Sequence, residues 1–298
     1  MTEKKPTIAL IYDFDGTLSP GNMQEYDFLQ EVGIKDSEEF WRQNDEDALR
    51  NNASSTLCGM QLILEKSRAA RKPIIQGTFQ KYGHGVEYYR GVAEWFDLIN
   101  LFGEKEHLNI EHYIISSGLK EMIEGTSIAR HFKQIFASAF LYDENGAAYW
   151  PAVAVDFTAK VQFLWMINKG VSKISDNRDI NIFVPDNERP VPFNHMIYLG
   201  DGFTDVPCMK LVKQNGGKSI AVYNPKGSLQ TPGGLIRDNR VNFICPADYS
   251  KGGPLHRMVK AIIRKMKYDH EFNQMERDNH KMFLDKMTET QGHTLPCK

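Results

Sequence analysis

The sequence predicts an α/β protein with a Rossmann-like parallel sheet, helices on both faces, and a small all-helical cap domain inserted after the first strand. Short apolar runs at residues 7–12, 112–118 and 195–202 are typical of strands that are buried on both faces. Helical patterns separate these runs, and alternating strands and helices favour a parallel sheet. Residues 22–90 show helical patterns alone, which is the length of a small inserted domain.

The first strand is the continuous apolar run at residues 7–12. The insert that follows reads as several helices, which we expect near residues 23–32, 37–50, 54–70 and 74–82. Ser37 followed by Glu39 and Phe40 is a plausible start for the second of them. We therefore predict two domains, a core of residues 1–19 and 91–298 and a helical cap of residues 20–90.

Strands and helices alternate after the insert. We expect helices over residues 91–102, 120–132, 159–168 and 254–275, and strands over 112–118, 195–202, 219–224 and 241–247. Residues 135–155 read as a hairpin, because Asp143, Glu144, Asn145 and Gly146 form a turn signal between two strand-like runs. Residues 170–194 are polar, contain proline and show no clear pattern.

The composition is that of an ordinary soluble globular protein, with 41% hydrophobic and 25% charged residues among 298. The net charge is −2, so the chain does not have the basic excess that indicates a nucleic-acid partner.

The chain has no apolar run long enough to cross a membrane, and its polar start MTEKKPT lacks the apolar region of a secretory signal. The four cysteines show no CxxC spacing, so we expect reduced thiols and a cytoplasmic location (Cys58, Cys208, Cys245 and Cys297).

Carboxylates directly follow two of the expected strands. Asp13 and Asp15 end the first strand, and on an extended backbone residues i and i+2 point the same way. Asp201 and Asp205 follow the apolar run that ends at Gly200. A cap or turn is the alternative for each pair, since Asp-Gly is a common turn signal. Because ligands bind at the carboxyl ends of parallel strands, we expect both pairs in one crevice.

Carboxylates that are buried near one another need a cation. No histidine or cysteine cluster lies at the same places, so oxygen ligands dominate. A few carboxylates combined with phosphate oxygens are the ligand pattern of Mg²⁺. The sequence therefore predicts Mg²⁺ as the cofactor.

Two further positions carry groups that suit phosphate. Ser116, Ser117 and Gly118 end the strand at 112–118, where a hydroxyl and the next backbone N–H groups can donate to anionic oxygens. A simple serine helix cap is the alternative. Lys160 opens a helix, where a cation is unfavourable for the helix dipole, and this suggests another use for its charge. A solvated surface lysine is the alternative there.

In this order, DFDGT, IISSG, a helix-opening lysine and GDGFTD, the motifs resemble the haloacid dehalogenase superfamily. The helical insert after the first motif is similar to the branch that contains phosphoserine phosphatase, which has a helical cap of the first type (C1). The four motifs span residues 8–205, about two thirds of the chain.

The resemblance implies a role for each motif residue. Asp13 would be the nucleophile that becomes an aspartyl phosphate, and Asp15 would protonate the leaving alcohol and then deprotonate water. The resemblance implies that the phosphate is held by Gly16, Thr17, Ser116, Ser117, Gly118 and Lys160. It implies that Mg²⁺ is bound by Asp13, Asp15 (through its backbone carbonyl), Asp201 and Asp205, the last either supporting the metal or orienting Lys160.

Asp15 narrows the reaction that the resemblance implies. The superfamily's dehalogenases and phosphonatases lack an aspartate at this place, and its transport ATPases have threonine there. We therefore expect a phosphatase acting on a small phosphorylated metabolite, because a cap that closes over the site excludes bulky substrates. A phosphomutase of a phosphosugar would also need Asp13 and Asp15. A non-catalytic binding protein with this fold is a third interpretation, although such a protein would usually lose one motif.

Overall fold

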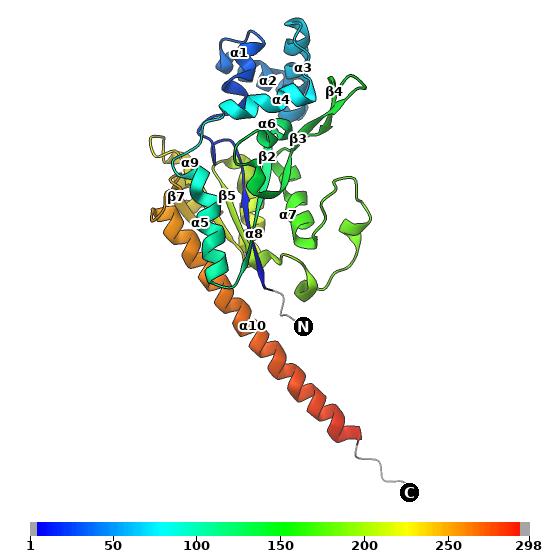
Figure 1. The fold of residues 1–298 in the computed structure, drawn as a ribbon, viewed down its shortest axis with the longest axis vertical. Helices are drawn as coiled ribbons and strands as arrows, with labels where there is room; N and C mark the ends of the chain where they lie inside the picture. The colour runs from blue at the N-terminus through cyan, green and yellow to red at the C-terminus, as the bar shows by residue number, and fades with distance from the viewer. Residues whose placement is uncertain (1–4, 293–298) are drawn as a thin grey trace.

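The computed structural model describes residues 5–292, without the side chains of residue 187 and residues 289–292. Its centre is a seven-stranded sheet in the order β4-β3-β2-β1-β5-β6-β7 (Figure 1). The strands are β1 (Thr7–Tyr12), β2 (Asn109–Leu119), β3 (Phe132–Tyr142), β4 (Ala148–Val153), β5 (Met196–Gly200), β6 (Lys218–Tyr223) and β7 (Phe243–Pro246). Neighbouring strands are parallel except in the β3–β4 hairpin at one edge, which is antiparallel. The expected Rossmann-like α/β class is confirmed.

Helices cover both faces of the sheet, which explains why the strands are continuously apolar. They are α5 (Val92–Lys105), α6 (Lys120–Glu124), α7 (Lys160–Lys169), α8 (Val206–Gln214), α9 (Gln230–Arg237) and α10 (Pro254–Gly292). Leu10 and Tyr12 of β1 pack toward the side of α5 and α10. Ala9 and Ile11 point the other way, into the apolar cluster formed with α7, α8 and α9. The buried strand β1 therefore anchors the two layers of the core.

The strand order reverses at β1. Its neighbours are β2 on one side and β5 on the other, so the chain turns outward in opposite directions from this point. In open parallel sheets, ligands bind where the order reverses, outside the carboxyl ends of the strands. The fold thus places a crevice at the residues that follow β1, β2 and β5.

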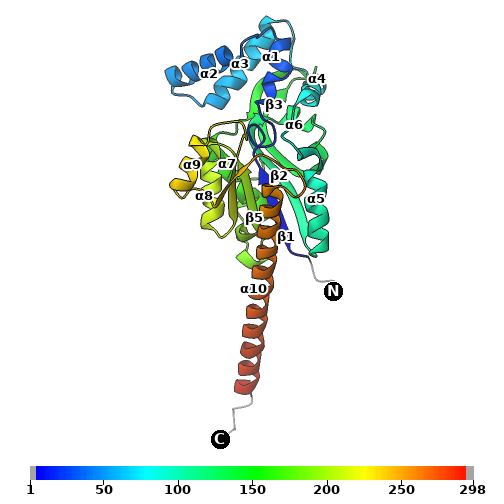
Figure 2. The ribbon, with the colours of Figure 1, turned by 90° about the vertical axis from the view of Figure 1, so that its left-hand side faces the viewer.

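Residues 20–90 contain helices that lie above the carboxyl ends of the strands, as Figures 1 and 2 show. They are η1 (Met23–Glu25), α1 (Phe28–Glu31), α2 (Ser37–Asn51), α3 (Ser55–Ala69), α4 (Gln76–Phe79) and η2 (Gln80–Gly85). Asp36 caps α2, since its carboxylate accepts from the backbone N–H groups of Glu38 and Glu39. The β3–β4 hairpin reaches this segment, where Ala148 N donates to Ile74 O at 2.8 Å.

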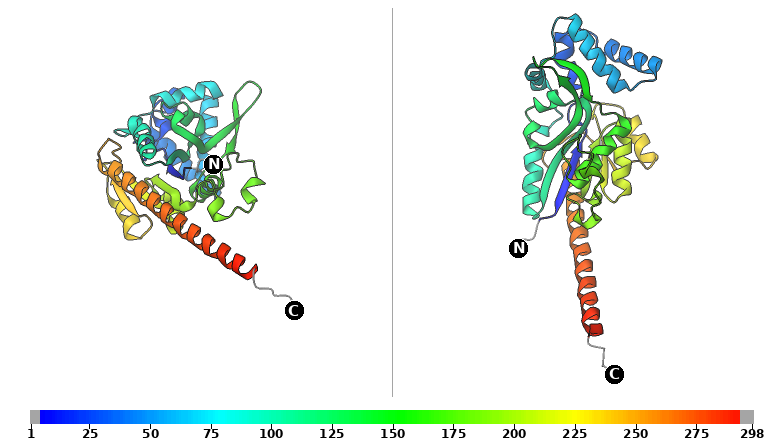
Figure 3. Two further views of the ribbon diagram at one scale, coloured as in Figure 1. Left: turned by 60° about the horizontal axis from the view of Figure 1, so that its bottom comes forward. Right: turned by 90° about the vertical axis from the view of Figure 1, so that its right-hand side faces the viewer.

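Four expected helices differ from the observed ones. The helices expected over 23–32 and 74–82 are each split, into η1 and α1 and into α4 and η2, and the helix expected over 120–132 ends at Glu124. Gly125 follows Glu124, and the hydroxyl of Thr126 caps the end of α6 by donating to Ile123 O at 2.6 Å. The fourth, α10, continues past residue 275 to Gly292, and its side chains from 275 to 288 are exposed. Figure 3 shows this part of α10 beyond the rest of the chain.

Residues 170–194 form three short turns of 3-10 helix, at Asp179–Asn181, Asp186–Glu188 and Phe193–His195. Cys58, Cys208 and Cys245 are free thiols, and Cys297 lies outside the described residues. Within residues 5–292, no helix is both long and apolar enough for a membrane span.

Candidate active site

The site forms where β1 and β5 end side by side. Asp13 N donates to Leu199 O at 2.9 Å, which ties the residue after β1 to the end of β5. Asp13 is 6% exposed, and its Oδ1 accepts from Phe14 N at 2.7 Å. Asp13 is thereby fixed at the bottom of the crevice with its Oδ2 directed to the start of α7.

Lys160 supplies the positive charge of the site. It opens α7, is completely buried, and donates from Nζ to Asp13 Oδ2 at 2.6 Å and to Asp205 Oδ1 at 2.8 Å. Burial would lower the pKa of this ammonium group, but the two adjacent carboxylates outweigh burial and raise the pKa above its usual value. Lys160 therefore stays charged between two carboxylates.

Asp205 joins the lysine to the loop after β5. Besides Lys160, its Oδ1 accepts from the hydroxyl of Tyr198 at 2.8 Å. Its Oδ2 accepts from the backbone N–H groups of Asp201 at 3.1 Å and Gly202 at 3.4 Å. A Cβ at Gly200 would come within 2.3 Å of Asp205 Oδ2, so this close approach requires glycine. With both oxygens occupied, Asp205 orients Lys160 and the loop that carries Asp201.

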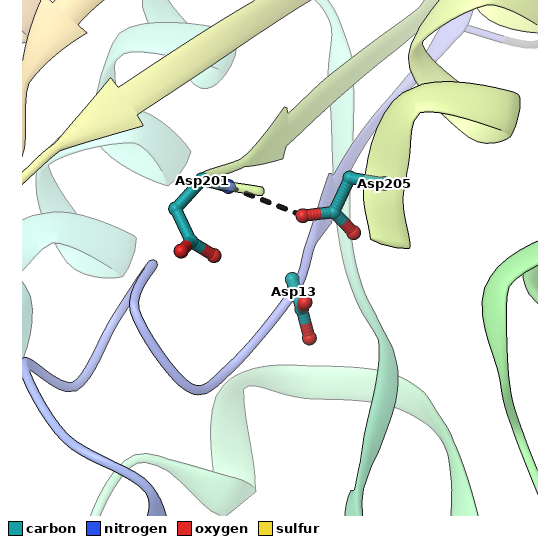
Figure 4. Close-up of side chains that lie close together, drawn as sticks. All are labelled: Asp13, Asp201 and Asp205. Atoms are coloured by element: carbon teal, nitrogen blue, oxygen red, sulfur yellow. Dashed lines mark hydrogen bonds between the residues drawn. The ribbon is translucent and has the colours of Figure 1, made fainter. Parts of the chain in front are cut away.

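Three carboxylates could hold a metal ion. One oxygen each of Asp13, Asp201 and Asp205 lies within 4.8 Å of the others, and Figure 4 shows the three side chains around one space. Burial, followed by the charge of Asp205, raises the pKa of Asp13 to about 6 and that of Asp201 to about 7. The raised pKa values mean that Lys160 alone does not balance the negative charge of the ionised carboxylates. A hard divalent cation such as Mg²⁺ would balance it and would bind to these oxygens.

Asp15 lies apart from the three carboxylates. Its Oδ1 accepts from Met23 N at 2.9 Å, and its Oδ2 faces Gly118, where an added Cβ would be 3.1 Å away. Burial, and then the charge of Asp13, raise the pKa of Asp15 well above its usual range. Both effects favour the protonated form of this side chain.

The serine motif closes another side of the crevice. Ser116 is 1% exposed, and its Oγ accepts from Gly118 N at 3.0 Å, so its own hydroxyl hydrogen can donate elsewhere. Ser117 is held through its carbonyl oxygen, which accepts from Ser138 Oγ at 3.0 Å. These contacts place a hydroxyl donor at the end of β2.

Gly16 and Thr17 lie between Asp15 and the loop after β5. Gly16 has a φ of +73°, and a Cβ there would approach Asp201 Oδ2 to 2.3 Å. Thr17 Oγ1 donates to Asp201 Oδ1 at 3.2 Å, and Thr17 O accepts from the hydroxyl of Tyr249 at 2.8 Å. Both residues thus set the position of the Asp201 carboxylate.

The family model of haloacid dehalogenase-like hydrolases matches residues 10–210, which contain all the residues described above except Tyr249. The chain belongs to the haloacid dehalogenase-like hydrolases. The expected superfamily membership is thereby confirmed.

Three similar proteins place this member of the family among its relatives. An uncharacterized protein of Borreliella burgdorferi is 28% identical over 293 aligned positions, which cover 88% of this chain and 99% of that protein. The structure of a probable phosphoserine phosphatase from Vibrio cholerae is similar with a TM-score of 0.53 and 12% identity, over 89% of this chain and 67% of that one. A protein of unknown function from Bordetella pertussis has a TM-score of 0.51 and 15% identity, over 81% of this chain and 99% of that one. At these identities the structural likeness shows the fold.

Sequence reasoning missed three residues that support the site of this haloacid dehalogenase-like hydrolase. Tyr198, Ser138 and Tyr249 hold Asp205, Ser117 and Thr17 through their hydroxyl groups. The role of Tyr198 could have been predicted, because a tyrosine in a strand that is buried on both faces needs a hydrogen-bond partner for its hydroxyl. The roles of Ser138 and Tyr249 could not, since their partners lie far away in the sequence.

Proposed function

We propose that the protein is a Mg²⁺-dependent phosphatase that hydrolyses a small phosphate monoester through an aspartyl-phosphate intermediate on Asp13. The observation that carries this proposal is the pairing of Asp13 with the buried Lys160 at 2.6 Å, beside the carboxylate of Asp201. A phosphate dianion and a carboxylate repel each other unless positive charge lies between them. The crevice offers one cation in Lys160 and a carboxylate set that fits another.

In the first step, Asp13 attacks phosphorus and the bond from phosphorus to the alcohol oxygen breaks. Asp15 gives its proton to the leaving oxygen, which its raised pKa allows. Lys160 and the Ser116 hydroxyl bind the phosphoryl oxygens. Asp13, the Asp15 carbonyl and Asp201, with Asp205 supporting them, would hold Mg²⁺, which would supply positive charge to the transferring phosphoryl group.

In the second step, water attacks the phosphorus of the aspartyl phosphate. Asp15, now ionised, takes a proton from this water, and the Asp13 carboxylate is restored as inorganic phosphate leaves. Gly16, Thr17, Ser117 and Gly118 complete the phosphate cradle in this proposal. Asp205 positions Lys160 through its Oδ1 in both steps.

We propose that residues 20–90 form the cap of the enzyme and that residues 1–19 and 91–298 form its catalytic core. Helices α2 and α3 lie over the carboxyl ends of the strands, where they can limit the size of the substrate. Ser54, the residue before α3, donates to Asp156 Oδ2 at 2.6 Å, four residues before Lys160. This contact links the cap to the segment that carries the catalytic lysine.

Phosphate release from p-nitrophenyl phosphate tests the proposal, with Mg²⁺ or with EDTA, for the wild type and Asp13→Asn. We expect release that needs both the metal and Asp13, with a loss of at least a thousandfold in the variant. Activity that persists in Asp13→Asn would contradict the nucleophile, and activity that persists in EDTA would contradict the metal. Accumulation of free phosphate also separates a phosphatase from a phosphomutase.

A further inference from the structure

A cavity of about 250 Å³ lies next to Asp15, between the cap and the core. The cap contributes Trp41, Asn44 and Asp45 from α2, together with the first turns of α3. The core contributes Asp15, Ser117 and Asp156. Because Asp15 is the proposed acid for the leaving oxygen, the alcohol part of the substrate would lie in this cavity. Its volume is below the roughly 300–1,000 Å³ of cavities for drug-sized ligands, so it suits a small alcohol.

The ionisable side chains that line this cavity are all carboxylic acids. Asp45 and Asp156 line it beside Asp15, the proposed proton donor, and no lysine, arginine or histidine of the described residues does. A further carboxylate, Glu25, stands directly behind the lining, where its Oε1 accepts from Trp41 Nε1 at 2.6 Å and from Asn22 Nδ2 at 2.7 Å. A carboxylate or second phosphate on the leaving alcohol would meet no cation of the protein here.

The N-terminus of α3 also reaches the cavity, and a helix N-terminus favours an anion. That place is taken by the protein itself. Ser54 caps α3 by accepting from Leu57 N at 3.3 Å, and its hydroxyl donates to the carboxylate of Asp156. The anion at this helix end is therefore Asp156, so the N-terminus of α3 does not provide a site for an anionic group of the substrate.

Two buried amide side chains in the cavity wall have unpartnered oxygens. Gln24 is 6% and Asn44 is 4% exposed, and neither Gln24 Oε1 nor Asn44 Oδ1 has a hydrogen-bond partner. Both residues line the cavity, as does Gly59, where an added Cβ would lie 3.3 Å from Asn44 Oδ1. A buried acceptor without a donor costs free energy that a bound donor recovers. A ligand whose N–H or O–H groups donate to these two oxygens would therefore be favoured in this cavity.

We propose, building on the phosphatase activity proposed above, that the substrates are phosphate monoesters of small amino alcohols. Their ammonium group would lie in the cavity near Asp45 and Asp156, with the unpartnered amide oxygens as acceptors. Trp41 and Phe157 add aromatic surface, which attracts ammonium and quaternary ammonium groups. Phosphoserine is a poor substrate in this account, because its carboxylate has no cation to bind.

The first test compares kcat/KM for phosphoethanolamine, phosphocholine, O-phosphoserine, glycerol 3-phosphate and p-nitrophenyl phosphate. We expect at least a tenfold preference for the two amino alcohol esters over phosphoserine and glycerol phosphate. Phosphoethanolamine and phosphoserine differ by one carboxylate, so this pair isolates the effect of negative charge. Glycerol phosphate has hydroxyl donors without an ammonium group, so it isolates the effect of positive charge.

A charge reversal on the cap provides the second test. Asp45→Lys should lower the ratio of kcat/KM for phosphoethanolamine over phosphoserine by about tenfold or more. Glu38→Lys is the matched control, since Glu38 is also exposed on α2, lies outside the cavity and carries the same charge. We expect it to leave the ratio unchanged. As a readout without turnover, phosphoethanolamine should raise the melting temperature of Asp13→Asn more than phosphoserine does.

The outcomes separate this inference from the phosphatase proposal. Cleavage of p-nitrophenyl phosphate with phosphoserine or glycerol phosphate preferred would overturn the amino alcohol assignment and leave the phosphatase standing. An unchanged ratio in Asp45→Lys would overturn the role of the cavity. Metal-dependent cleavage of none of the five esters would reject the phosphatase, and the inference with it.

Discussion

Replacing Lys160 with methionine removes the cation that lies between Asp13 and Asp205. Methionine keeps most of the length of the side chain, so the change is mainly one of charge. Two buried carboxylates would then face each other with oxygens within 4.8 Å, a repulsion of about 3 kcal/mol at an effective dielectric constant near 20. Removing one partner from a buried ion pair costs about 3–5 kcal/mol in general. We therefore expect Lys160→Met to lower the free energy of unfolding by about 3–5 kcal/mol at pH 8 without metal.

The pH dependence of this loss identifies its cause. The pKa of Asp13 is about 6 even beside Lys160, and without the lysine it rises further. At pH values between about 3.9, the pKa in the unfolded chain, and this raised pKa, Asp13 binds a proton in the folded state but not in the unfolded state. The free energy of unfolding therefore increases as the pH falls through this range. In urea unfolding with EDTA, the deficit of Lys160→Met should shrink between pH 8 and pH 5. Lys210→Met, at an exposed position on α8, is the control with the same change in net charge. Equal losses in both variants, or a deficit that is independent of pH, would refute the reasoning.

Three other predictions concern separate parts of the molecule. Burial lowers the pKa of His112 to about 3, so the unfolded state alone binds a proton between that pH and 6.5; stability should fall by about 2 kcal/mol from pH 7.5 to pH 5, and urea unfolding of His112→Gln should lack this part of the slope. Gly16→Ala places a Cβ within 2.3 Å of Asp201 Oδ2 at a φ of +73°, so the Mg²⁺ concentration for half-maximal activity should rise about tenfold or more; an unchanged metal titration would contradict this role for Gly16. Ser54→Ala removes both the cap of α3 and the contact with Asp156, and thermal unfolding should show a loss of about 1–2 kcal/mol, whereas a loss near zero would argue that the link is not formed in solution.

The strands could be predicted from the sequence because their signals are local. Residues 7–12 and 196–200 are short apolar runs that end in carboxylates, and they lie where the patterns placed them. Asp13, Asp201 and Lys160 could be located for the same reason, since the two aspartates follow strands and the lysine opens a helix, whereas Ser116 lies within β2. The roles proposed for Asp13, Asp15 and Lys160 remain predictions, although the geometry brings Asp13 and Lys160 into direct contact.

Features that depend on distant contacts could not be predicted. The helix over residues 120–132 was wrong beyond Glu124, because β3 takes up Phe132 as its first residue to pair with β2. The cavity next to Asp15 is lined by residues that are far apart in the sequence, such as Asn44 and Asp156, and no sequence pattern connects them. The length of α10 beyond residue 275 also escaped prediction, since its exposed methionine and phenylalanine side chains do not mark a core-facing stripe.

The position of β1 at the centre of the sheet has a consequence for how the protein folds. Thr7 pairs with Asn109 and Ala9 with Met196, so the contacts on both sides of this strand join distant parts of the chain. Such contacts are slow to form, because long loops must close before they are made. No fragment of the chain assembles the crevice early, since Asp13, Ser116 and Asp201 meet only when three far-separated segments have docked. In a refolding experiment, the return of activity should therefore coincide with the last phase of the recovery of structure.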